Sequence, residues 1–137
     1  MTEVNNLTAY SIDKKILRRI SREILKKESA KGRFKKGDLS IVLVGQKRIK
    51  ELNKRYRRKN RPTDVLAFED KENLGEIVIC PAEIKKNAKK FNSTFKKELN
   101  RVLIHGILHL LGYDHESGPK KAKIMEERQK YYLSKIQ

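Results

Sequence analysis

The spacing of apolar residues along this 137-residue chain predicts five helices. Isoleucine recurs at every fourth position from Ile12 to Ile24, which is the repeat of an amphipathic helix. Two later segments carry start signals, because Pro81 suits the first helical position and Ser93 or Thr94 suits a cap. The helices are expected at about residues 11–28, 46–57, 81–91, 94–112 and 119–134.

Shorter runs of branched apolar residues between these helices predict four strands. Polar loops are expected from Gly32 to Gly37 and from Arg58 to Thr63, and the sequence EDKEN marks a turn before the last strand. Helices and strands interleave without a repeated strand–helix–strand unit. We therefore predict an α+β fold with a mixed β-sheet of about four strands packed by helices. The strands are expected at residues 3–9, 38–44, 65–68 and 74–80.

No internal repeat, low-complexity tract or linker divides the chain, so residues 1–137 are expected to form a single domain. One cysteine, Cys80, excludes an intramolecular disulfide and a cysteine-rich zinc finger. It follows three branched apolar residues and is expected to be buried rather than nucleophilic. No long apolar stretch near the start indicates a signal peptide or a membrane span, so we expect a cytoplasmic location.

Net charge is the strongest compositional signal, with 34 Lys and Arg against 17 Asp and Glu and a formal net charge of +17. Such an excess favours a polyanion as partner, because basic side chains release the counterions condensed on phosphates. The stretch from Gln46 to Arg61 has nine basic residues and one acid, and the stretch from Lys85 to Lys97 has six lysines. A solvated, lysine-rich surface without a ligand is the alternative, and charge by itself gives no sequence specificity.

All three histidines of the chain, His105, His109 and His115, lie within the run HGILHLLGYDH. The first two are four residues apart and therefore project from one face of a helix. Gly112 lies where this helix would stop, since glycine adopts the left-handed conformation cheaply, and the turn lets the third imidazole return toward the first two. Three neutral imidazoles with an open fourth position are the ligand set of a catalytic zinc, which predicts a metal-dependent hydrolase.

The alternative is that these imidazoles are ordinary hydrogen-bonded core residues. Residues 102–111 are apolar apart from Gly106 and the two histidines, so this helix is expected to be buried. An unsatisfied buried polar group costs roughly 1–3 kcal/mol, and a shared metal would supply both imidazoles with a partner. Nickel, copper or iron would also suit three imidazoles.

Three nearby residues bear on the chemistry. Zinc proteases with the related pattern H-E-x-x-H use the glutamate as general base, and Gly106 occupies that position, which disfavours this mechanism. Asp114, beside the third histidine, could activate water or fix the tautomer of an imidazole, and we favour the second role. Met125 lies ten positions beyond His115 and could lie under the metal or belong to the core.

The run HGILHLLGYDH resembles the signature H-G-x-L-H-L-x-G-Y-D-H of the YbeY family, bacterial endoribonucleases that act in ribosomal RNA maturation. LNKRYRRKNRPTDVLAF, residues 52–68, is similar to the family segment L-N-x-x-Y-R that runs into P-T-(D/N)-V-L-(S/A)-F. LGEIVIC, residues 74–80, is similar to the family strand L-G-(D/E)-I-x-I. These three motifs span residues 52–115, and one minor departure is Ala67, where serine is common.

This resemblance implies a zincin-like metal site in which the three histidines hold one zinc per chain and His105 also takes part in catalysis. It implies that Arg57 lies in the cleft and is needed for activity, and that Thr63 and Asp64 border the same cleft. The residues alone would accept any of the three arginines that crowd this loop. Only the resemblance selects Arg57.

The function that the resemblance implies is zinc-dependent endonucleolytic cleavage of single-stranded RNA, in 3′ end maturation of 16S ribosomal RNA and in ribosome quality control. Arg58, Lys59 and Arg61 are expected to contact RNA, and the ribosome or its proteins are expected as partners. The sequence does not choose between water and the ribose 2′-hydroxyl as the attacking group. Two other functions stay open: a ribosome assembly factor with a structural zinc, and a metallohydrolase of another bond, such as an ester or amide.

Overall fold

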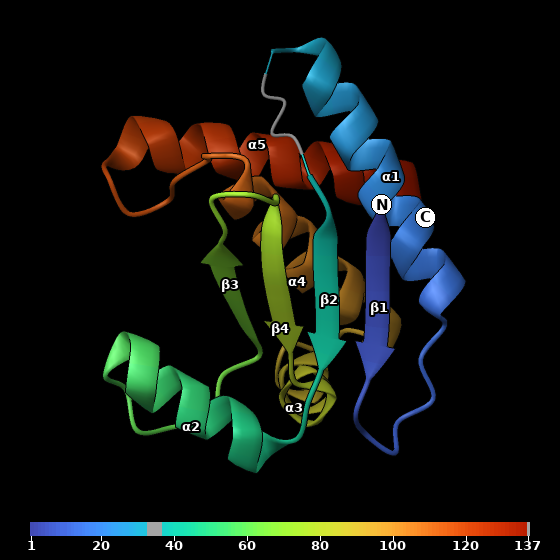
Figure 1. The fold of residues 1–137 in the computed structure, drawn as a ribbon, viewed down its shortest axis with the longest axis vertical. Coiled ribbons are helices and arrows are strands. Elements are labelled where there is room, and N and C mark those ends of the chain that lie inside the picture. Colours follow the sequence, from blue (N-terminus) through green and yellow to red (C-terminus); the bar gives the residue numbers. More distant parts are fainter. Residues whose placement is uncertain (33–36, 137) are drawn as a thin grey trace.

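The computed structural model of the chain describes residues 1–32 and 37–136, which form a four-stranded sheet and five helices (Figure 1). The strands are β1 (Thr2–Asn6), β2 (Leu39–Leu43), β3 (Val65–Glu69) and β4 (Gly75–Ile79). The helices are α1 (Lys14–Ala30), α2 (Gln46–Arg57), α3 (Pro81–Lys90), α4 (Phe95–Leu110) and α5 (Pro119–Ile136). Every element expected from the sequence is present, and the α+β fold is confirmed.

The sheet is mixed, with the strand order β1-β2-β4-β3. β1 and β4 run parallel to β2, whereas β3 pairs antiparallel with β4 and places Val65 opposite Ile79. A short turn joins β3 to β4, as antiparallel pairing allows, and helical connections join the parallel strands. The start of β3, which follows the arginine-rich loop, therefore lies beside the end of β4.

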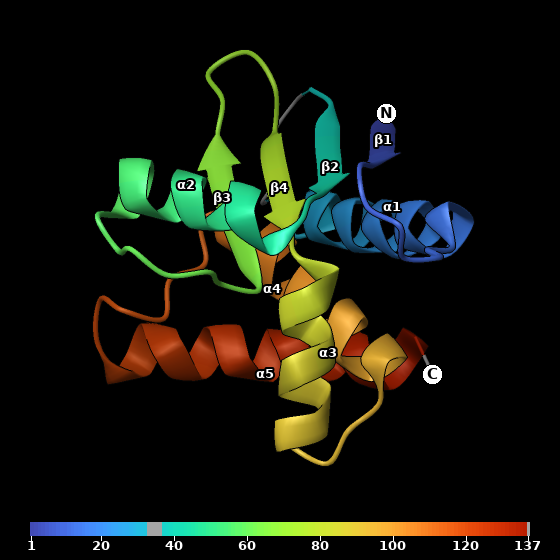
Figure 2. The same cartoon turned by 90° about the horizontal axis from the view of Figure 1, so that it is seen from below.

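One face of the sheet is covered by α1, α4 and α5 and holds the main core (Figures 1 and 2). Ile41 and Ile77 point to this face and pack with the apolar side of α4. Side chains alternate along a strand, so Val42 and Val78 point to the other face, where they join Ile49 of α2 in a smaller cluster. α4 is the central helix, since it contacts β3 and β4 as well as three other helices, α1, α3 and α5.

Local capping sets the element boundaries that apolar spacing leaves open. The Asp13 carboxylate accepts hydrogen bonds from two backbone N–H groups, so α1 begins at Lys14 rather than at residue 11. β1 ends earlier than expected, at Asn6, whose side chain bonds to the turn that follows. The loop expected from Gly32 to Gly37 lies, apart from its two glycines, outside the described residues.

Two sulfur-containing side chains belong to the core. Cys80 is fully buried at the start of α3, as expected, and burial raises the pKa of its thiol. Met125 is buried in the main core, so α5 uses it for packing. None of the helices in residues 1–32 and 37–136 is long and apolar enough to cross a membrane.

Candidate metal centre and its cleft

Helix α4 carries two of the three histidines, and its sequence fixes it against the sheet. Thr94 caps the helix, because its hydroxyl accepts a hydrogen bond from the backbone N–H of Lys97 at 3.1 Å. A Cβ at Gly106 would meet the Ile77 side chain of β4 at 3.2 Å, so glycine lets the helix approach the sheet closely. Position 106 therefore serves packing in this chain, where a zinc protease of the H-E-x-x-H type carries its glutamate.

The turn after α4 has the hydrogen bonds of a Schellman motif. Gly112 donates to the carbonyl of His109 at 3.0 Å, and Tyr113 donates to the carbonyl of Leu108 at 3.1 Å. Gly112 has a φ of 97°, a left-handed conformation that costs free energy in residues with a side chain. The chain therefore reverses directly after the helix, as the position of this glycine predicts.

We expect Gly112→Ala to lower the free energy of unfolding by about 1–2 kcal/mol. The loss would come from backbone strain, because no described residue beyond its two chain neighbours has a heavy atom within 4 Å of the position that the added Cβ would take. Denaturant unfolding measures the loss. Gly112→Asn is the matched variant and should lose less, since asparagine tolerates the left-handed region. An asparagine variant no more stable than the alanine variant would contradict this explanation.

The three histidines line one cleft of about 410 Å³. The ring centroids of His105 and His115 lie 5.0 Å apart, and His109 follows His105 by one helical turn. In the part of the chain that the structure describes, no three His, Cys, Asp or Glu side chains are already arranged around one ion position. The side chain of His115 is half-exposed, so its imidazole has room to turn toward the two helical histidines.

The surroundings of the two helical histidines fit a metal. Burial lowers the pKa of His105 below its usual value, which favours the neutral imidazole that binds metals. The Nδ1 atom of His109 is buried and has no hydrogen-bond partner among the described residues. Such an atom costs roughly 1–3 kcal/mol unless a ligand compensates it. Three imidazoles that line one cleft match the donor set of a catalytic zinc.

A second wall of the cleft is basic and comes from α2 and the loop that follows it. Arg57, Lys59 and Arg61 line the cleft together with the histidines. Asn53 is buried and holds this loop, because its side-chain N–H donates to the carbonyl of Arg61 at 2.9 Å. Its backbone carbonyl also accepts from the N–H of Lys59 at 3.3 Å. The sequence of α2 thus positions three positive charges beside three imidazoles.

Arg58 differs from its two basic neighbours in position. It ends α2 with a φ of 58°, and it is not among the residues that line the cleft. The left-handed conformation turns the chain between two cleft residues, Arg57 and Lys59. The structure therefore separates Arg57 and Arg61, which line the cleft, from Arg58, which the sequence alone treats as equivalent.

Thr63 and Asp64, which directly precede β3, lie in different surroundings. Thr63 lines the cleft. The Asp64 carboxylate instead accepts a hydrogen bond from Asn87 of α3 at 3.3 Å and lies 3.8 Å from the guanidinium of Arg101 on α4. The position of Asp64 differs from the expected one at the cleft border, because its carboxylate links β3 to these two helices.

Asp114 bonds within its own turn. Its carboxylate accepts hydrogen bonds from the hydroxyl of Ser117 and from the backbone N–H of Glu116, and both lower the pKa of Asp114. The imidazole contact that we expect of Asp114 is made in this structure by Gln129 of α5, whose Oε1 lies 2.9 Å from Nδ1 of His105. Asp114 thus shapes the turn that carries the third histidine.

A buried network ties that turn to α1 and α5. Glu28 is fully buried and accepts hydrogen bonds from the hydroxyl of Tyr113 at 2.5 Å, from Arg128 at 2.8 Å and from the hydroxyl of Tyr132. Burial alone would raise the pKa of Glu28, but these bonds outweigh it and hold the pKa below its usual value. Tyr113 lies two residues before His115, so the network fixes the turn between helix and third histidine.

We expect Glu28→Gln to lower the free energy of unfolding by about 3 kcal/mol at pH 7, because it leaves the charge of Arg128 without its buried partner. A carboxyl group whose pKa is lower in the folded than in the unfolded protein stabilises the fold at pH values above its unfolded-state pKa of about 4.3. This stabilisation is lost as the pH falls through the folded-state pKa. The difference between wild type and variant should therefore shrink in acid. Urea unfolding at pH 7 and pH 3 tests this, and an equal difference at both would contradict it.

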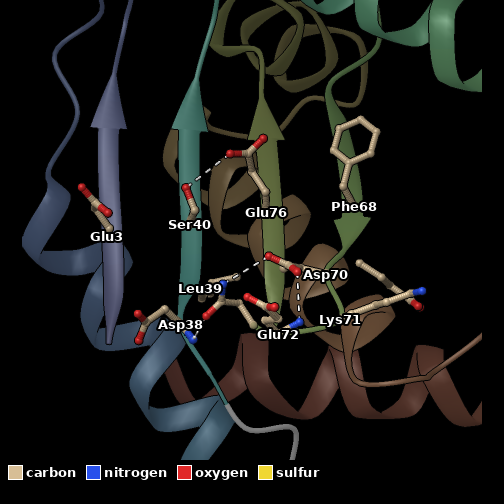
Figure 3. Close-up of a pocket in the computed structure, with 12 residues that line it drawn as sticks. Glu3, Asp38, Leu39, Ser40, Phe68, Asp70, Lys71, Glu72 and Glu76 are labelled. Carbon is tan, nitrogen blue, oxygen red and sulfur yellow. Dashed lines mark hydrogen bonds between the residues drawn. The ribbon is translucent and has the colours of Figure 1, made fainter.

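A larger hollow, of about 710 Å³, lies on the sheet face away from α4 and α5, beside the β3–β4 turn (Figure 3). Glu3, Ser40 and Glu76 project from this face (Figure 3). The residues that line the hollow include six acids and one lysine. Negative charge disfavours phosphate here, so the polyanion indicated by the net charge fits the histidine cleft rather than this hollow.

Three residues of the site are not predicted from the sequence, because local patterns mark them weakly or not at all. Asn53 has one, since it lies four residues after Ile49 on the buried side of α2, where a polar side chain is unusual. Glu116 is the one acidic residue among the described residues that line the cleft, and its Oε1 lies 3.7 Å from Nε2 of His115. Gln129 is far along the chain from the histidines, and no local pattern marks it.

The family model for endoribonuclease YbeY matches residues 3–137. A Thermotoga maritima protein named endoribonuclease YbeY is 48% identical over 118 residues, which cover 83% of this chain and 74% of that protein. A protein of the same name from Petrotoga mobilis is 38% identical over 136 residues, 97% of this chain and 92% of that protein. The solution structure of a Thermotoga maritima protein has a TM-score of 0.68 and 40% identity, and covers 99% of this chain and 89% of that one. The chain therefore belongs to the endoribonuclease YbeY family.

Proposed function

We propose that this chain is a zinc-dependent endoribonuclease that cleaves single-stranded RNA during ribosomal RNA maturation. The observation that carries the proposal is that three histidines and three basic side chains line one cleft. The family supports the reaction class, because its relatives bear the name endoribonuclease. The proposal extends to 3′ end maturation of 16S ribosomal RNA, ribosome quality control, contact with the ribosome or its proteins and action in the cytoplasm.

Zinc would be held by His105, His109 and His115, one ion per chain, with a further position left open. A bound zinc would supply Lewis acidity, which lowers the pKa of water and polarises a phosphoryl oxygen. The lowered pKa of His105 and the unpartnered buried nitrogen of His109 support this ligand set.

The side chains of the cleft would bind and orient the RNA. Arg57 would grip the scissile phosphate with two N–H groups and offset the charge that develops in the transition state. Lys59 and Arg61 would hold flanking phosphates, with their loop kept in place by Asn53. Glu116 is the carboxylate available to accept a proton beside the histidines.

The size of the cleft favours an unpaired strand. A volume of about 410 Å³ lies in the range of sites that enclose one small ligand. Such a cleft can take an unpaired nucleotide, whereas two paired strands would have to separate first. Surface lysines and arginines would follow the rest of the backbone electrostatically, without reading its sequence.

Single-turnover assays with zinc-loaded protein separate this proposal from its two alternatives. We expect cleavage of a single-stranded RNA, slower cleavage of the same sequence in a duplex, and no turnover of peptide or ester substrates. RNA binding without cleavage would favour an assembly factor with a structural zinc. Cleavage of a peptide or ester, with RNA untouched, would favour a metallohydrolase of another bond.

RNA affinity should fall steeply as salt rises, because basic side chains release counterions from the RNA. Neutralising Arg58, Lys59 and Arg61 together should reduce the slope of log affinity against log salt by about 2, since each phosphate that a basic side chain neutralises on a single strand adds about 0.7 to that slope. Zinc content should not change, since none of the three is a proposed ligand. Affinity that does not depend on salt would mean that the charge of +17 is only a surface property.

A further inference from the structure

Helix α5 contacts one of the three histidines through Gln129. The Oε1 atom of Gln129 lies 2.9 Å from Nδ1 of His105, and the two residues are 24 positions apart in the chain. Both side chains are partly buried, so water competes less for this hydrogen bond than at an exposed site. Gln129 therefore orients the His105 ring although it is not itself a proposed metal ligand.

The orientation of the Gln129 amide decides which nitrogen of the His105 imidazole carries the proton. A neutral imidazole carries one N–H, and the carbonyl oxygen of an amide can only accept. If Oε1 faces Nδ1, then Nδ1 carries the proton and Nε2 keeps the lone pair that a metal needs. The opposite amide orientation would donate to Nδ1 and leave the proton on Nε2, which would block binding through that atom.

Helix α5 is held in place beside this contact by the neighbouring residue. Arg128 donates to the buried carboxylate of Glu28 at 2.8 Å and to the hydroxyl of Tyr132 at 3.0 Å. Tyr113, which precedes the third histidine by two residues, donates to the same carboxylate. Adjacent residues of α5 thus support the first histidine directly and the turn of the third through Glu28.

We propose that Gln129 is a positioning residue that holds His105 in the Nδ1–H tautomer and so presents Nε2 to the metal. This inference rests on the proposed zinc site. It assigns to Gln129 the tautomer-fixing role that the sequence suggests for Asp114, whose carboxylate bonds within its own turn.

Zinc affinity is the first readout, measured by competition with a chelator. Gln129→Met removes the acceptor at similar size and should weaken zinc binding 10- to 100-fold, roughly the cost of losing a partner of a metal-bound histidine. Gln129→Glu keeps an acceptor at the same place and should bind zinc at least as tightly as wild type. Lys130→Ala, an exposed neighbour on α5 paired with Glu126, is the control and should not change the affinity.

The ring ¹⁵N shifts of His105 are the second readout, measured on metal-free protein at neutral pH. Wild type and Gln129→Glu should show the Nδ1–H tautomer, and Gln129→Met should shift the population toward Nε2–H. A merely structural role would not produce this pattern, since the glutamate variant restores the tautomer only if an acceptor is what matters.

Two outcomes would overturn the inference. One is an unchanged zinc affinity in Gln129→Met, and the other is a His105 tautomer that is the same in all variants. Failure of the proposed zinc site gives a different result, because wild-type protein would then bind no zinc, whereas failure of the proposed RNA cleavage would leave the zinc affinities and ring shifts unaffected. If no zinc binds, the ring shifts still decide whether Gln129 sets the tautomer.

Discussion

Arg57→Ala should lower the single-turnover rate of RNA cleavage about 10²- to 10³-fold, the usual cost of removing one preorganised electrostatic donor. Arg57 lines the histidine cleft, so its guanidinium can stabilise charge on a phosphate held there. The fold and the zinc content should stay as in wild type, because Arg57 is exposed and is not a proposed ligand. RNA affinity should fall little, since many other basic residues share the nonspecific binding. Cleavage rate, zinc content and RNA affinity are measured side by side.

Two further variants make the test of Arg57 specific. Arg57→Lys should recover only part of the rate, because an ammonium keeps the charge but not the planar two-point grip. Arg58→Ala is the matched control and should cleave like wild type, since Arg58 is not among the cleft-lining residues. An inactive Arg58→Ala beside an active Arg57→Ala would mean that these roles are exchanged. If neither Arg57→Ala nor Arg58→Ala changes the rate of RNA cleavage, the loop serves ribosome docking, and the assembly-factor alternative gains support.

His109→Ala should lose most of its zinc and, with it, RNA cleavage. The wild-type protein should contain about one zinc per chain, and removal of one of three protein ligands leaves the site below the usual catalytic complement. The variant also deletes the buried Nδ1 atom that has no partner among the described residues. The free energy of unfolding of the metal-free variant should therefore stay close to that of metal-free wild type. Metal analysis of the purified protein measures zinc content directly.

A control on the same helix separates loss of a ligand from damage to α4. Lys97→Ala removes an exposed side chain of α4 and should keep zinc and cleavage at wild-type levels. Full zinc retention in His109→Ala would rule out the three-histidine site. Loss of zinc together with loss of helical structure would instead indicate that His109 mainly supports the fold.

Apolar spacing predicts the elements of this fold well because each of them buries one side. Ile20 and Ile24 of α1 are buried, as are most of the branched apolar residues of β2 and β4, while Ile16 and Val42 are partly buried. Element ends are less predictable, because single polar side chains set them. Asp13 begins α1 three residues later than the spacing suggests, and Asn6 ends β1 where its side chain bonds the following turn.

The part of the site that is local in sequence could also be predicted. His105, His109 and His115 occupy one helix and its glycine turn, so their spacing fixes their relation. Gln129 and Glu28 reach this region from distant segments, 24 and 85 positions from the residues they bond. No short-range repeat marks such partners, because tertiary packing alone brings them together.

The prediction of which arginine acts in the cleft depends on the family resemblance as well as on the residue types. Composition and charge treat Arg57, Arg58 and Arg61 alike, and the resemblance selects Arg57. The structure supplies a physical reason for part of this choice. Arg58 takes the left-handed conformation at the end of α2, while the residues on either side of it line the cleft.

Zinc titration of metal-stripped protein, followed by single-turnover cleavage of single-stranded RNA, tests the central claim most directly. Activity should be absent without metal, rise in proportion to added zinc and level off at about one ion per chain, as a site with three histidine ligands requires. His109→Ala titrated in parallel should stay inactive at the same zinc concentrations. Cleavage by the stripped protein at the wild-type rate, or a zinc-saturated protein that leaves RNA intact, would contradict the account.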